Sequence, residues 1–436
     1  MAHITVDLLF ASWSGELSKK DLHWLTYSHL VQICPVCAKE YAKFAQVQKH
    51  LTHCLAHPQL DTSERAEELI RLLDGPPPLA EKERRRAQRW LKSLDELPYE
   101  RWEAKIDRAR TRLRGPAFAF ELLESARAAT PDDPQRIYAC AAAAQQVAGI
   151  FHPQRSELYA LAIAHQVNAL RLQSDYRAAG ARASVLSLVL QEVDAPLALA
   201  EVGSLLGSFY MDMRRFGHAR THLRRALALY NSLDREVLAA RIRLQLSGVE
   251  HYAGNSAEAV AILESVEELD LAAHPDLRLV VQLNLAMMRC ALGDAERAHD
   301  ILQALSPWES HLSGRHRLNY RWIAARVAAG LGRWQEALDG LEALKSTYDR
   351  MGLDYCCALI ALDIAAVHLD RGDIESAVFT VEQVVDDLQR FHLEPDAEAW
   401  AQELQMALGR RMLTASFLRS RLRHLEHASH RMRNKS

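Results

Sequence analysis

The sequence predicts an all-α repeat protein built from stacked helix pairs of about 40 residues each. The first observation is a set of six alanines separated by 40, 40, 39, 39 and 40 residues: Ala179, Ala219, Ala259, Ala298, Ala337 and Ala377. Each alanine closes a short turn-like segment, such as RFGHA or GDAERA, and in five units a bulky aliphatic residue follows four positions later. A fixed period of this length is the signature of stacked repeats.

The composition agrees with this fold. The chain has 436 residues with only 18 glycines and 14 prolines, and Ala, Leu, Arg and Glu are good helix formers. No segment approaches the ~20 apolar residues of a membrane span. The first residues lack the basic and apolar regions of a signal peptide. Seven cysteines, an odd number, fit a reducing cytosol. We therefore expect a cytoplasmic protein.

Four segments follow along the chain. Residues 1–57 contain a close Cys/His cluster, 58–115 form a Pro-containing linker followed by basic helices, 116–409 carry the helix-pair pattern, and 410–436 form a basic capping helix and tail. The C-terminal segment has eight Lys/Arg against one Asp/Glu, and residues 80–115 have twelve against seven. The repeat segment between these two basic stretches is acidic.

Local sequence signals mark the elements in order. The run Gly75-Pro76-Pro77-Pro78 breaks any helix and indicates a linker. A basic helix follows, with Trp90, Leu91, Leu94 and Leu97 on one face and Pro98 at its end. Later prolines separate successive helix pairs, at Pro131 to Pro134, Pro153, Pro196, Pro275 and Pro395. We find no strand-type alternation and no Gly-rich phosphate loop.

The clearest unit, GSLLGSFYMDMRRFGHARTHLRRALALY, resembles the tetratricopeptide family. Small residues stand where the two helices of that family cross, here Gly207, Ala219 and Ala226. The usual unit has ~34 residues, so this chain is similar to subclasses with longer helices. Several units lack the large aromatic residue early in the first helix. The resemblance implies a right-handed α-solenoid that acts as a non-enzymatic scaffold for protein–protein interaction.

In tetratricopeptide geometry the first helix of each pair lines the concave surface. Counting along these helices predicts that the following residues lie on the concave surface and bind a partner: Arg171, Arg241, Gln245, Asn284, Asn319, Trp322 and Arg326. Asn and Arg side chains can bond a peptide backbone or its carboxylates, and Arg can do so with two parallel bonds. An alternative interpretation is that these are ordinary solvated positions.

The N-terminal segment contains a second pattern, in which GELS, His29 and Cys34-Pro35-Val36-Cys37 resemble the zinc-binding anti-sigma domain. The resemblance covers residues 3–45 and implies a small helical module with structural Zn²⁺ held by His29, Cys34, Cys37 and His3, with His23 as a substitute for His3. It also implies a bacterial regulator whose partner is a protein such as a sigma factor. One departure is that four residues, not three, separate His29 from Cys34, which rotates a helical side chain by about 100°.

Two other interpretations of the same cysteines stay open. Cys34, Cys37, His50 and Cys54 have the spacing of a classical zinc finger, although AKEYAKFAQVQKHL has the pattern of an uninterrupted helix. In the third interpretation no metal binds and these side chains pack in a core. Either zinc site would be structural, because four protein ligands leave no open position for a water nucleophile.

The sequence does not favour an enzyme. It contains no G-x-S-x-G, H-E-x-x-H or Walker motif. His218 and His222 stand four apart on one helix, without a third metal ligand in view. We expect a protein or peptide partner that binds the repeats, the zinc module or both. The alternative is nucleic-acid binding through the basic segments 80–115 and 410–436, which would weaken steeply with salt.

Overall fold

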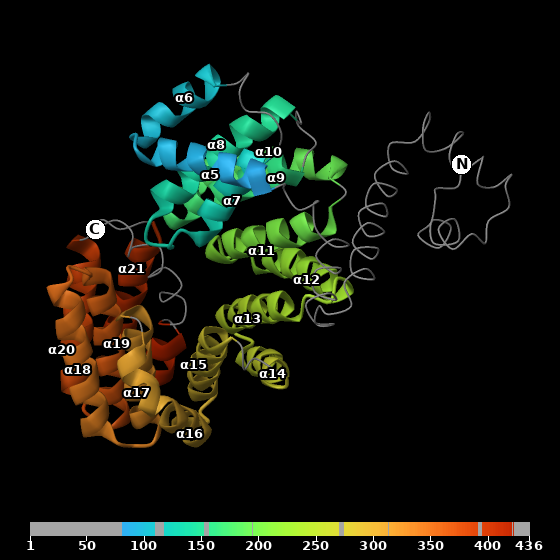
Figure 1. The fold of residues 1–436 in the computed structure, drawn as a ribbon. Coiled ribbons are helices and arrows are strands. Elements are labelled where there is room, and N and C mark those ends of the chain that lie inside the picture. Colours follow the sequence, from blue (N-terminus) through green and yellow to red (C-terminus); the bar gives the residue numbers. More distant parts are fainter. Residues whose placement is uncertain are drawn as a thin grey trace, which may run out of the picture. The chain divides into compact units, whose positions relative to one another are not determined.

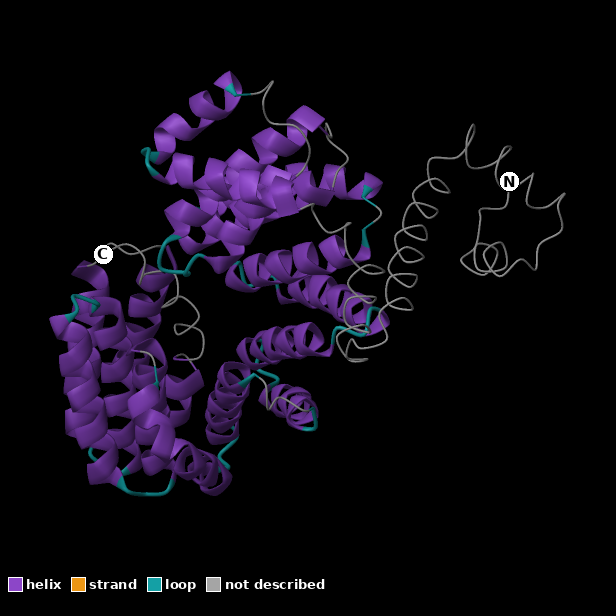
Figure 2. Cartoon of the chain, viewed as in Figure 1, coloured by secondary structure: helices purple, strands orange, loops and turns teal. Residues whose placement is uncertain are grey.

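The computed structural model describes residues 81–109, 117–151, 157–193, 195–269, 274–312, 314–390, 395–420 and 422. The chain divides into two compact units, Met1–Ala87 and Gln88–Ser436. Nearly all described residues belong to the second unit, and these residues form helices joined by short loops, without a strand (Figure 2). None of the described helices is long and apolar enough to cross a membrane.

The described part begins with α5 (Glu81–Asp95), the 3-10 helix η2 (Tyr99–Arg101) and α6 (Trp102–Arg108). Helix pairs follow (Figure 1). The first helices of the pairs are α7 (Ala117–Ala128), α9 (Glu157–Leu172), α11 (Pro196–Asp212), α13 (Glu236–Tyr252), α15 (Pro275–Ala291), α17 (Gly314–Gly330), α19 (Asp354–Asp370) and α21 (Pro395–Gly409). The second helices are α8 (Pro134–Phe151), α10 (Tyr176–Val189), α12 (Phe216–Ser232), α14 (Ser256–Glu267), α16 (Ala295–Leu305), α18 (Trp334–Arg350) and α20 (Ile374–Arg390). Further 3-10 turns, η3 (Leu190–Glu192) and η4 (Ser306–His311), follow α10 and α16.

The predicted period is confirmed by the turns within the pairs. One residue of each turn from α9 to α20 has a positive φ: Ser174, Arg214, Gly254, Gly293, Gly332 and Gly372. The residue after each of these donates its N–H to a carbonyl five positions earlier, as from Asp175 to Leu170 at 2.9 Å. This bond and the left-handed residue before it end the first helix as a Schellman motif does. The left-handed conformation favours glycine, which occupies four of these six positions.

The recurring alanines lie where the two helices of a pair meet. Ala179, Ala219, Ala259, Ala298, Ala337 and Ala377 are all 0% exposed. The residue twelve positions before is also small in most units, and at Gly207 an added Cβ would lie 2.5 Å from the Leu223 side chain. Small residues therefore let the helices approach closely, while the aliphatic residue four positions after the alanine fills the space beside them.

Neighbouring pairs pack mainly through the second helix of one pair and the first helix of the next, as in α12 with α13 and α18 with α19. Two junctions differ, because α11 packs mainly against α9, and α17 packs against both α15 and α16. Prolines open α8, α11, α15 and α21, at the first helical position where the missing N–H costs no hydrogen bond. Since no pair can bury its apolar face alone, stacking supplies the core.

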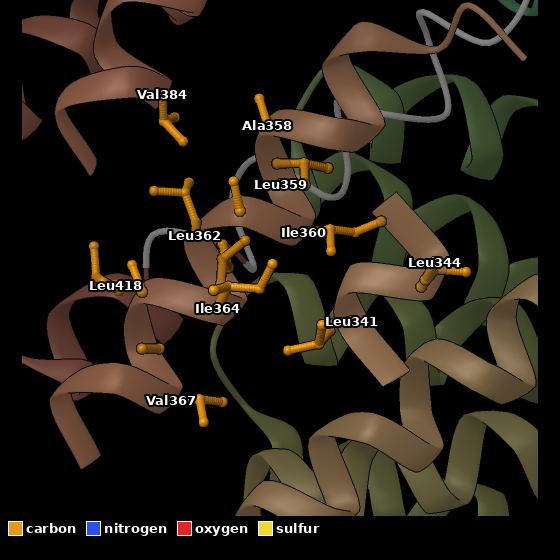
Figure 3. Packing of buried hydrophobic residues seen from close by; sticks show 14 of the residues in the cluster. Leu341, Leu344, Ala358, Leu359, Ile360, Leu362, Ile364, Val367, Val384 and Leu418 are labelled. Atoms are coloured by element: carbon orange, nitrogen blue, oxygen red, sulfur yellow. The ribbon is translucent and has the colours of Figure 1, made fainter. Parts of the chain in front are cut away.

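A large apolar cluster of the described residues lies around α19. In Figure 3, Leu341 and Leu344 of α18 and Val384 of α20 lie around the α19 side chains Ala358 to Val367. Leu418, from the short helical segment at 415–420, is 0% exposed in the same cluster. The described C-terminal residues thus contribute to the apolar core at that end.

Candidate functional site

Polar side chains link the first helices of neighbouring pairs. We call the surface that carries these links the first-helix face. Five of these links join a residue to another 37 or 41 positions later: Arg171 to Asp212, Ser204 and Ser208 to Gln245, and Trp322 and Arg326 to Asp363. The two separations differ by four residues, one helical turn, so they bracket the unit length of 39 or 40. The period that stacks the helices also aligns these side chains.

A half-buried carboxylate, that of Glu201, organises the N-terminal end of this face. Arg127 of α7 donates two bonds to Glu201 of α11, at 2.7 and 2.8 Å, and His165 Nε2 of α9 lies 2.9 Å from Glu201 Oε1. Burial opposes ionisation of Glu201, but the bonds from His165 and Arg127 and the Arg127 charge outweigh it and lower the pKa of Glu201 to about 2. The carboxylate is therefore charged at neutral pH.

Next to it, Arg171 bridges two first helices. Its Nη1 donates to Asp212 Oδ2 at 2.8 Å, and its Nε donates to Asn168 Oδ1 at 3.1 Å. The Arg171 side chain is 18% exposed and that of Asp212 only 6%. Together with Glu201 and His165, these residues line a cavity of about 550 Å³, which we call the charged cavity.

The middle of the face carries neutral hydrogen bonds. Gln245 of α13 accepts a bond from Ser204 at 2.9 Å and donates one to Ser208 at 3.2 Å, both on α11. Its amide and the two hydroxyls are half-buried. These groups can exchange their mutual bonds for bonds to a bound main chain, because each acts as both donor and acceptor.

A second carboxylate, that of the buried Asp363 of α19, organises the C-terminal end. Trp322 Nε1 donates to its Oδ2 at 2.6 Å, and Arg326 Nε does so at 2.8 Å. The Arg326 guanidinium also lies 4.8 Å from the centre of the Trp322 ring. Trp322 is only 6% exposed, so its ring offers little surface to a partner, whereas the Arg326 side chain is 21% exposed.

The other predicted first-helix residues join none of these links. Asn284 donates to Val280 O of its own helix at 2.8 Å, Asn319 is half-buried, and Arg241 is exposed on α13. The structure therefore brings Arg171, Gln245, Trp322 and Arg326 into contacts between helices and leaves these three outside them. Whether any of the seven binds a partner stays a prediction.

The predicted zinc ligands His3, His29, Cys34 and Cys37, with the alternatives His23, His50 and Cys54, lie outside the described residues. Within the described ranges, no group of three or more His, Cys, Asp or Glu side chains could hold a metal ion. The pair His218 and His222 stacks on the ring of Tyr210, each with ring centres 5.2 Å apart. Burial and the charges of His218 and Arg225 lower the pKa of His222.

Sequence reasoning missed the acidic partners of this face. Glu201, Asp212 and Asp363 are buried or half-buried carboxylates on first helices, and none was predicted as a site residue. The signal that would find two of them is a basic or aromatic residue on one first helix followed 37 or 41 positions later by an acid. Arg171 with Asp212 and Arg326 with Asp363 both satisfy it.

No family model and no curated protein matches this chain. Among solved structures, the fold is similar to aspartyl phosphate phosphatase F from Bacillus subtilis, with 12% sequence identity, a TM-score of 0.48, and coverage of 89% of this chain and 96% of that chain. It is also similar to a Rap protein complexed with competence and sporulation factor, with 13% identity, a TM-score of 0.45, and coverage of 79% and 99%.

Proposed function

We propose that this protein is a non-enzymatic scaffold that binds an extended peptide segment of a protein partner on its first-helix face. The observation that carries the proposal is the series of hydrogen-bonding side chains aligned on consecutive first helices by the repeat period. A peptide main chain offers one acceptor per residue and, except at proline, one donor. Amide, hydroxyl and guanidinium groups on this face match both kinds of group.

The spacing of the helices suits an extended ligand. The first helices α9 and α11 pack directly against each other. Packed helices lie about 8–10 Å apart, and an extended chain advances about 3.3–3.6 Å per residue. A peptide that crosses from one of these two helices to the other therefore advances by about three residues. Arg241 is exposed on the same helix as Gln245, so its guanidinium is available to a carboxylate of the partner.

Selection from a displayed library of random peptides tests this proposal. The immobilised full chain is the target, and each selected peptide is then measured by calorimetry against Gln245→Ala and Arg241→Glu. We expect both substitutions to weaken binding, with Arg241→Glu acting most on peptides that carry an acidic residue. Calorimetry and circular dichroism on the same samples confirm that the variants are folded.

Arg297→Ala provides the matched control. Arg297 lies on the second helix α16, and its side chain is 70% exposed. This substitution should leave peptide affinity unchanged. Peptides that bind both first-helix variants as tightly as the unmodified chain, or a selection that enriches no peptide, would contradict the proposal.

We further infer that the partner belongs to bacterial gene regulation, with a sigma factor as the specific candidate. This inference rests on the resemblance of residues 3–45 to zinc-binding anti-sigma domains and on that part of the sequence alone. Its test is capture of the partner by the full chain and by a Cys34→Ser, Cys37→Ser double variant. A sigma factor bound by the full chain and lost from the double variant is the expected result, and retention by both would place recognition on the repeats.

One arginine of the basic C-terminal segment already pairs with an acidic residue of its own chain. Arg419, in the described part of the C-terminal segment, pairs with Asp370 of α19 and so faces a carboxylate of its own chain. Filter binding to single- and double-stranded DNA at low and high salt would separate the two functions, because binding to phosphates weakens steeply as salt rises.

A further inference from the structure

A second cavity, of about 420 Å³, lies near the C-terminal ends of four first helices, and we call it the apolar cavity. It is lined by residues of α13, α15, α17, α18 and α19, by the start of α16, and by Arg419 and Leu422 near the end of the described chain. Its volume falls in the range of small-molecule sites, about 300–1,000 Å³. It is separate from the charged cavity and shares no lining residue with it.

The wall of this cavity is mainly apolar. Most of its surface comes from aliphatic, aromatic, sulfur-containing and glycine residues: Met287, Cys290, Ala291, Gly293, Ala295, Ile323, Ala329, Gly330, Trp334, Leu341, Val367 and Leu422. Burial raises the pKa of the Cys290 thiol, which is therefore protonated at neutral pH and behaves as a small apolar group.

The arginine and aspartate side chains of the wall form two ion pairs. Arg326 is paired with Asp363 at 2.7 Å, and Arg419 is paired with Asp370. The Arg419 and Asp370 side chains are 45% and 23% exposed, against 21% and 5% for Arg326 and Asp363. The more exposed pair thus marks the side of the cavity nearer to solvent, and the other pair lies deeper.

We propose that the apolar cavity binds a small, uncharged, mainly apolar molecule of one or two rings. Burial of such a ligand against the apolar wall is favourable by a free energy of about 25 cal/mol per Å² of apolar surface removed from water. A ligand with a net charge would have to be desolvated without a free counter-charge, because each arginine here already faces an aspartate. This site goes beyond the proposed partner-binding function and does not depend on it.

Indole is the probe for this proposal, since it is uncharged, has two rings and carries one N–H. Binding to the full chain is measured by saturation-transfer NMR and calorimetry, beside the anion indole-3-acetate and the cation tryptamine. We expect saturable one-to-one binding of indole, with each charged analogue at least tenfold weaker. Equal binding of all three compounds, or no binding of indole, would overturn the proposal.

Cys290 reports the location of the ligand. The rate of its alkylation by N-ethylmaleimide is followed by peptide mass spectrometry, with the half-buried Cys357, which does not line the cavity, as internal reference. With indole at ten times its dissociation constant, a single-site ligand that blocks the thiol slows alkylation of Cys290 by about tenfold. The rate at Cys357 should not change. Equal rates at Cys290 with and without bound indole would place the ligand elsewhere.

Cys290→Phe tests the same point by filling the cavity. It should abolish indole binding, while Leu292→Phe, two positions away at a 48% exposed residue outside the lining, should leave binding intact. If Cys290→Phe does not fold, the alkylation measurement on the unmodified chain still decides. Indole binding that survives in a folded Cys290→Phe variant would contradict the assignment.

Discussion

The charged cavity and the apolar cavity are built on the same repeating scaffold, and each is organised by one carboxylate. Glu201 of the charged cavity is 22% exposed and is held by Arg127 and His165. Asp363 of the apolar cavity is 5% exposed and is held by Trp322 and Arg326. The difference teaches that the repeat determines where first-helix side chains meet, while a few substitutions decide whether the wall at that point is more charged or more apolar.

The largest effect should come from removing the deeper carboxylate. Asp363→Ala removes the buried carboxylate that pairs with Arg326 in a mainly apolar wall, which should cost about 3–5 kcal/mol of unfolding free energy. Glu201→Ala should cost less, because Arg127 is also paired with Glu124 at 2.6 Å and is 31% exposed. Urea denaturation of the two variants measures this difference. An equal loss in both would show that the two carboxylates are buried to the same effective degree.

Low pH should remove the stabilising contribution of the Glu201 carboxylate. The pKa of Glu201 is lowered from 4.5 to about 2, so its stabilisation is fully present above about pH 5 and is lost as pH falls toward 2. The shift corresponds to about 3 kcal/mol at neutral pH. Unfolding free energy measured across this window should therefore fall less in Glu201→Gln than in the unmodified chain. Parallel curves for the two proteins would rule out this contribution.

The turns within the helix pairs also differ between the N-terminal and the later pairs, and they offer a smaller, conformational test. Ser174 and Arg214 adopt positive φ in the N-terminal pairs, where later pairs have glycine. Arg214→Gly should therefore raise stability by about 1 kcal/mol, and Gly254→Ala and Gly293→Ala should lower it by about as much. Nothing lies within 4 Å of a Cβ added at either glycine, so the loss would report backbone strain alone. We expect the thermal unfolding midpoint to rise for Arg214→Gly and to fall for Gly254→Ala and Gly293→Ala.

The smallest effect concerns the ring N–H of Trp322. Trp322→Phe keeps an aromatic ring under Arg326 but removes one of the bonds to Asp363, which should cost about 1 kcal/mol or less. Tyr320→Phe is the control, since it removes a hydroxyl that donates to Leu302 O outside both cavities. If Trp322→Phe costs no more than this control measured by urea denaturation, the Trp322 bond adds nothing to the organisation of Asp363.

Much of the fold could be predicted because packing within a pair is local. The alanine period fixed the turns, and Ala259 or Ala337 is fully buried where the pattern requires a small residue. The cavities were harder to predict, since they depend on contacts between units. Arg171 could be placed on a first helix by counting, but its partner Asp212 is 41 residues away and was chosen by the packing of α11 on α9.

Trp322 illustrates the same limit. Its position on a first helix was predicted correctly, yet its ring is buried against Asp363 and Arg326, a detail that counting along one helix cannot reveal. The zinc-ligand predictions for His29, Cys34 and Cys37 lie outside the described residues and stay predictions.

The evenly spaced left-handed residues have a consequence for how this chain can change length. Cuts made at equivalent turn residues, such as Gly254 and Gly293, remove one complete unit of 39 residues and rejoin two backbones of the same conformation. The turn at the junction then keeps its backbone conformation. Insertion or deletion of whole units therefore changes only the packing between the two units that become neighbours. A lineage could in this way shorten or lengthen the reach of the molecule in single steps, while a cut placed inside a helix would break the pairing on both sides.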